Sequence, residues 1–90
     1  MGYTYKQKFN KKYGFKLNEP HNLKEIAKIS GYKYSGIKNI FEKGEGAFHS
    51  NPESVRPSVK SPQQWGYARV YSAVMGGKAQ KIDKKDLKKN

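Results

Sequence analysis

Residues 23–41, which read LKEIAKISGYKYSGIKNIF, decide the fold of this chain of 90 residues. Asn22 stands just before the first apolar residue and is of a type that caps helix starts. Gly31 tolerates the left-handed backbone that ends one helix and reverses the chain. On both sides of it apolar residues recur at helical spacing: Leu23, Ile26, Ala27, Ile37 and Ile40. We therefore predict helices over about 23–30 and 34–43.

These two helices are expected to share one small core. Glu25, three residues after the cap, suits a capping box at the first helix. Gly44 is expected to end the second helix, and Gly36 inside it lowers its stability by roughly 1 kcal/mol relative to alanine. The side chains expected to fill the shared core are Ile26, Ala27, Tyr32, Ile37 and Ile40.

The order Ile26-Ala27, Gly31-Tyr32, Ile37 and Ile40 resembles the helix-turn-helix of bacterial repressors. Ser30 departs from that pattern, because an apolar residue is usual there. The resemblance implies that the second helix reads DNA. The alternative is a common αα-hairpin whose helices only build a core.

A third helix is predicted over 62–75. Ser61 is a capping residue, Pro62 suits the first helical position, and a pair of glycines follows the last apolar residue. Its wide apolar surface indicates a central helix packed on several sides. Arg69 is its only charge, and a half-buried charge requires a partner. Two roles remain open for Arg69: an ion pair with Glu42 or Glu45, or a contact with a phosphate or a partner chain.

The charge of the chain points to an anionic partner. There are 19 lysines and arginines against 7 acids, giving a formal net charge of +12 and a pI near 9.9. Solubility alone needs a net charge of roughly 2–8 in a small domain. The surplus gathers at the two ends, in residues 1–16, which contain no acid, and 78–90, which contain two. Basic ends of this kind suit segments that follow phosphates.

Aromatic residues alternate with the lysines of residues 1–16. Such aromatics stack on unpaired bases in single-strand binders, or they anchor a basic segment to a small core. We favour anchoring for Phe9, Tyr13 and Phe15.

The segment 44–60 is expected to be an irregular connection, because two prolines bias the residues before them away from helix. Arg56 in this segment is a candidate phosphate ligand together with Ser54 and Ser58. Pairing with Glu53 or with backbone carbonyls is the other role open to Arg56.

Together these patterns predict an all-α fold, a small three- to four-helix domain with extended basic termini. We expect a basic aromatic arm over 1–16, a helical core over 17–77, and a basic tail over 78–90 that contains a short helix capped by Asp83 and seated by Ile82 and Leu87. No cysteine is present, which excludes disulfides and thiolate sites. No apolar run reaches the ~20 residues of a membrane span, and none follows the basic start as in a signal peptide.

A second resemblance covers most of residues 10–87. The pieces SVRPS (54–58), SP (61–62), Trp65 and ARVYSAVMGGK (68–78) are similar to a small domain of unknown function that recurs in large DNA viruses of algae and protists and in some phages. The resemblance implies a viral protein that is packaged in the virion, and a location in the virion or in the host cytoplasm or nucleus rather than secretion. That family carries no catalytic residues that transfer to this chain.

Two hypotheses on function follow. The first is a DNA-binding module that places the second helix in the major groove, with nucleic-acid contacts from Lys33, Tyr34, Ser35, Lys38, Asn39, Arg56 and Arg69. The second is a minor capsid or cement protein whose basic arms bind neighbouring virion proteins. The sequence leaves homo-oligomerisation open. We expect no enzyme, cofactor or metal, because the two histidines lack ligand spacing and no phosphate loop is present.

Overall fold

A computed structural model describes residues 3–50 and 61–89 of the chain, so Arg56 lies outside the described residues. Within these residues all regular structure is helical, as predicted. The elements are α1 (Tyr5–Tyr13), α2 (Leu23–Ser30), α3 (Tyr34–Ser50), α4 (Pro62–Val74), α5 (Lys78–Ile82) and the 3-10 helix η2 (Lys84–Asp86).

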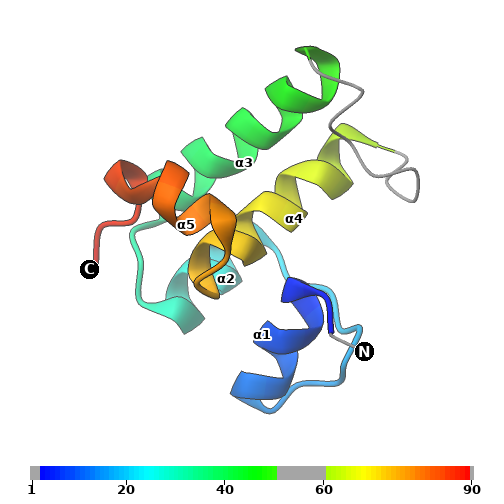
Figure 1. Ribbon diagram of the computed structural model, residues 1–90. Coiled ribbons are helices and arrows are strands. Elements are labelled where there is room, and N and C mark those ends of the chain that lie inside the picture. The colour runs from blue at the N-terminus through cyan, green and yellow to red at the C-terminus, as the bar shows by residue number, and fades with distance from the viewer. Residues whose placement is uncertain (1–2, 51–60, 90) are drawn as a thin grey trace.

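Helix α4 occupies the centre, with α3 alongside it, α1 against one side and α5 against another (Figure 1). Its start follows the prediction: the Ser61 hydroxyl accepts a hydrogen bond from the backbone N–H of Gln64 at 3.1 Å, and Pro62 takes the first position. Val70 and Ala73 are fully buried. The central position expected of this helix is confirmed.

Helices α2 and α3 form the predicted pair. The Asn22 side chain accepts from the backbone N–H of Glu25 at 2.8 Å, and Gly31 ends α2 with φ 81°. The carboxylate of Glu25, however, pairs with the ring of His21 at 3.3 Å instead of completing a capping box. The predicted core residues Ile26, Ala27, Ile37 and Ile40 are all buried, with Tyr32 packed at their edge.

The prediction that Gly44 ends the second helix was wrong, because α3 continues to Ser50. Gly44 instead lies where α3 meets α4. A Cβ atom at Gly44 would stand 2.7 Å from the Cα of Gly66, closer than real Cβ contacts come. These two glycines let the helix backbones touch, and that packing outweighs the low helix propensity of glycine.

The N-terminal residues 5–13 form a helix of the core rather than an extended arm. Thr4 and Gln7 make a reciprocal capping box at the start of α1. Phe9 and Asn10 are fully buried, and Asn10 donates to the carbonyls of Leu17 and Glu19 at 2.9 and 3.1 Å. The anchoring role favoured for Phe9 agrees with this packing.

The C-terminal residues also fold onto the body. Asp83 stands at the N-cap position of η2, as expected, but its side chain makes no capping hydrogen bond there. The same residue ends α5, and its backbone N–H donates to the carbonyl of Ala79 at 2.8 Å. Leu87 packs against the core as expected, whereas Ile82 is 63% exposed and does not anchor the C-terminal segment to the core.

Candidate nucleic-acid interface

The first two turns of α3 present the predicted face to solvent. Gly36, Ile37 and Ile40 point into the protein, since all three are buried. The residues between them, together with Lys33 just before the helix, are exposed: Lys33, Tyr34, Ser35, Lys38 and Asn39. The structure therefore brings five of the seven candidate residues together on one accessible surface.

The C-terminal segment, residues 84–89, lies against the start of α3. The backbone N–H of Lys33 donates to the carbonyl of Lys88 at 2.7 Å, and Tyr32 forms an isolated antiparallel bridge with Lys89. A Cβ atom at Gly36 would overlap the backbone carbonyl of Asp86. Gly36 is thus the place where the segment crosses the helix.

This crossing creates a small cavity of about 110 Å³, which we call the lysine pocket. That volume equals a few water molecules at ~30 Å³ each. Within residues 3–50 and 61–89, the side chains of Ser35 and Asn39 have no hydrogen-bond partner. The pocket is lined by Lys33, Ser35, Gly36, Asn39, Lys85, Asp86 and Lys88.

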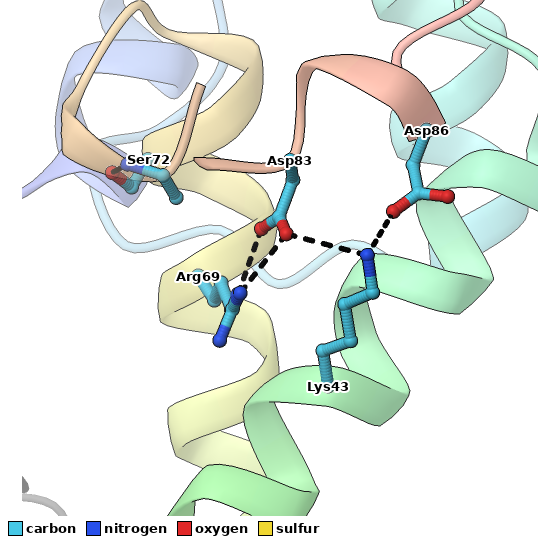
Figure 2. Close-up of polar contacts among 6 residues, drawn as sticks. Lys43, Arg69, Ser72, Asp83 and Asp86 are labelled. Carbon is cyan, nitrogen blue, oxygen red and sulfur yellow. Dashed lines mark hydrogen bonds and ion pairs between the residues drawn. The ribbon is translucent and has the colours of Figure 1, made fainter. Parts of the chain in front are cut away.

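Asp86 is the one acid in that lining, and its charge is already compensated. The Lys43 ammonium donates to its Oδ2 at 2.5 Å and lies 3.6 Å from Oδ1 of Asp83 (Figure 2). The hydrogen bond to Asp86 is the main reason that the pKa of Lys43 is raised. The unpaired charges at the pocket are therefore those of the three lysines.

Arg69 has a structural partner, and that partner is Asp83 rather than Glu42 or Glu45. Its Nε and Nη2 donate to the two carboxylate oxygens at 2.7 and 2.9 Å (Figure 2). Asp83 is only 1% exposed, so this bidentate pair ties the C-terminal residues to α4. Hydrogen bonding to Asp83 raises the pKa of Arg69. Because its guanidinium is engaged in this ion pair, Arg69 is not included in the proposed interface.

Two further lysines at the edges of this surface rest on tyrosine rings. Lys89 Nζ lies 4.2 Å from the ring centroid of Tyr32, and Lys24 Nζ lies 5.9 Å from that of Tyr34. Such cation–π contacts are worth roughly 0.5–1 kcal/mol at exposed sites. They restrain the lysines and leave the ammonium groups accessible.

The sequence reasoning missed Lys85 and Lys88 as members of this surface, because it treated the C-terminal tail as a separate segment. A signal was present in Gly36: a glycine in the first turn of an otherwise regular helix indicates close approach of another backbone. The sequence did not say which backbone approaches.

Other chemistry has little support among the described residues. His21 is buried, with its Nε2 2.6 Å from Asn10 Oδ1 and its Nδ1 3.3 Å from Glu25. In the part of the chain that the structure describes, no three His, Cys, Asp or Glu side chains gather in a way that could hold a metal ion. No helix there is long and apolar enough to cross a membrane.

The fold and this surface define a small all-α domain in which a short-turn helix pair carries a lysine-rich, solvent-exposed face. The chain belongs to the Family of unknown function (DUF5824), whose model matches residues 2–90. No curated protein and no solved structure matches it.

Proposed function

We propose that this protein binds duplex DNA, with the first two turns of α3 in the major groove and the lysine pocket on a backbone phosphate. The observation that carries the proposal is the lysine pocket itself. Three lysines from two separate parts of the chain meet there beside the exposed face of α3, and the one nearby acid is paired.

The pair α2–α3 supports the helix-turn-helix part of this proposal. Three residues, 31–33, separate the helices, which is the usual turn length of that motif. Recognition helices contact base edges with their N-terminal residues, and Tyr34, Ser35, Lys38 and Asn39 near the start of α3 are exposed. Asn39 has the side chain that pairs bidentately with adenine, while Lys38 suits a guanine edge or a phosphate.

Within α3, the lysine without an acidic partner among the described residues lies near the start of the helix, at Lys38. Glu42 is exposed one turn after Lys38, Glu45 is partly exposed, and Lys43 between them is paired with Asp86, so the second half of α3 adds no unpaired lysine. DNA is therefore expected to contact α3 near its N-terminus, with residues 84–89 along the adjoining backbone. This geometry fits an end-on insertion of the helix.

The alternative of a minor capsid or cement protein relied on free basic arms. Residues 5–13 are folded onto this chain's own core. The N-terminal part of the chain that this hypothesis would use as a free arm is therefore shorter than the expected 16 residues. A viral setting stays part of our proposal, supported by the resemblance of residues 54–78 to a domain of large DNA viruses and phages. In that setting we place the protein with the genome, in the virion or the infected cell, as a binding protein and not an enzyme.

The test is fluorescence anisotropy with a duplex of about 20 base pairs at ~50 and ~200 mM salt. Six to eight phosphate contacts predict that log K falls with log salt with a slope of roughly −5 to −7. Lys38→Glu is expected to weaken binding by about tenfold and to reduce the slope by about 1.

Lys12→Glu is the matched control. It makes the same change of charge at an exposed lysine of α1, which packs against α4. If both variants weaken binding equally, general charge and not the α3 face holds the DNA. If the affinity of the unaltered protein scarcely changes with salt, the proposal is wrong.

A further inference from the structure

A second and larger cavity, which we call the tyrosine pocket, lies away from the α3 face. It has a volume of about 540 Å³ and is formed by the start of α1, the residues just before α2 and the stretch of α4 from Gln63 to Tyr71. It shares no lining residue with the lysine pocket. Its volume is within the range of small-molecule sites, which is about 300–1,000 Å³.

Tyr71 at this pocket carries a hydrogen-bonding group that the fold does not use. The residue is 2% exposed and lines the cavity, yet its hydroxyl has no hydrogen-bond partner among residues 3–50 and 61–89. Within the same residues, no side-chain nitrogen or oxygen is both fully buried and unpartnered. The Tyr71 hydroxyl therefore keeps some contact with the space of the pocket.

The surroundings of Tyr71 keep this hydroxyl protonated. Burial raises its pKa well above the usual value of 10.0, and the neighbouring Tyr67 and Glu25 raise it further. The group is therefore a hydrogen-bond donor at every physiological pH. Unsatisfied donors on nearly buried side chains are uncommon in proteins and call for an explanation, such as a ligand.

Three tyrosines contribute to the walls of the pocket. Tyr5 and Tyr67 line it together with Tyr71. His21 also belongs to the lining, but its side chain is 0% exposed and both of its nitrogens are occupied inside the protein, so it offers no side-chain surface to a ligand. Such walls suit a planar ring that needs few polar contacts on its faces.

The rim of the pocket supplies positive charge and amides. Lys6 and Gln63 are part of the lining. The sequence of α1, YKQKFNKKY, contains four lysines and no acid, and Lys8 lies 5.0 Å from the ring centroid of Tyr5. This run of lysines extends past the pocket and exceeds what one phosphate group would need. A ligand with a planar ring and several phosphate groups spaced along a strand would match both the walls and the rim of the pocket.

We propose that the tyrosine pocket binds an unpaired base of single-stranded nucleic acid, with the flanking phosphates on the lysines of α1. The base stacks on tyrosine, and one of its edges accepts a hydrogen bond from the Tyr71 hydroxyl. This site goes beyond the duplex-binding surface of α3 and does not depend on it.

The experiment compares two fluorescein-labelled strands of equal charge by anisotropy: one of about eight thymidines, and one of the same length with abasic spacers in place of the bases. Base stacking on aromatic side chains predicts that the thymidine strand binds at least about tenfold more tightly. Tyr71→Phe removes only the hydroxyl, and loss of one hydrogen bond predicts about fivefold weaker binding of the thymidine strand and no change for the abasic strand.

Equal affinity for the two strands would overturn the proposal, and so would an undiminished preference for thymidine in Tyr71→Phe. Lys38→Glu separates this site from the duplex site. It is expected to leave the preference for thymidine unchanged while duplex binding falls. A chain that ignores duplex DNA but keeps the preference would refute the proposed function and leave the tyrosine pocket standing.

Discussion

Replacing Gly36 by alanine tests whether the C-terminal segment is packed on α3. Alanine in a helix is ordinarily more stable than glycine by up to ~1 kcal/mol. At Gly36, however, the new methyl group would overlap the backbone carbonyl of Asp86. Overpacking of this kind typically costs about 1–3 kcal/mol, so Gly36→Ala is expected to destabilise the protein despite its better helix propensity.

Gly46→Ala provides the control on the same helix. Gly46 is exposed, and a Cβ atom there would meet nothing within 4 Å. It should therefore gain ~0.5–1 kcal/mol. The two variants are expected to differ by ~2–4 kcal/mol, which for a domain of this size is roughly 10–20 °C in melting temperature.

Thermal unfolding followed by circular dichroism measures this difference in stability. Hydrogen exchange at the amide of Lys33 shows whether the contact between α3 and residues 84–89 is the one affected. Gly36→Ala should speed exchange at the amide of Lys33, because its hydrogen bond to the carbonyl of Lys88 is disturbed. Equal stabilisation by both alanines, with unchanged exchange, would show that the segment does not lie on α3 in solution.

Three further predictions concern the body of the domain. Arg69→Met should cost about 3 kcal/mol in urea denaturation, because the buried Asp83 carboxylate would lose its bidentate partner and keep only the Lys43 ammonium at 3.6 Å, and adding Asp83→Asn should recover most of that loss. The raised pKa of Tyr71 contributes stability that is complete below its unfolded value of 10.0 and is lost as the pH rises above it, so the unfolding midpoint of Tyr71→Phe should fall less in alkali than that of the unaltered protein. Thr4→Ala should lose about 1 kcal/mol, since the Thr4 hydroxyl caps α1 by accepting from Gln7; an unchanged stability would mean that α1 contributes little to the fold.

Local signals in the sequence were sufficient for α2, for the start of α3 and for α4. Caps such as Asn22 and Ser61 act within one turn, and apolar spacing gives the buried side directly. The exposed residues at the start of α3 could be predicted for the same reason. These features depend on neighbours in the sequence, so no knowledge of the tertiary structure was needed.

The remaining features depend on contacts between distant residues. Gly44 reads as a helix end until its contact with Gly66 on α4 is known. From the sequence, residues 5–13 resemble an arm because their lysines dominate the composition, whereas in the structure Phe9 and Asn10 are fully buried. The pairing of Arg69 with Asp83 instead of Glu42 requires α5 to fold back, which no local pattern predicts.

The hydrogen bond between Lys33 and Lys88 joins the middle of the chain to its end. Closing so long a loop costs entropy before any contact is gained, so the lysine pocket is expected to assemble late in folding and to open early under denaturant. A phosphate in that cavity would thus bind only the completed fold and would raise its melting temperature in proportion to the logarithm of ligand concentration. Phosphate binding would therefore stabilise the contact between residues 33 and 88, which is expected to form last in folding.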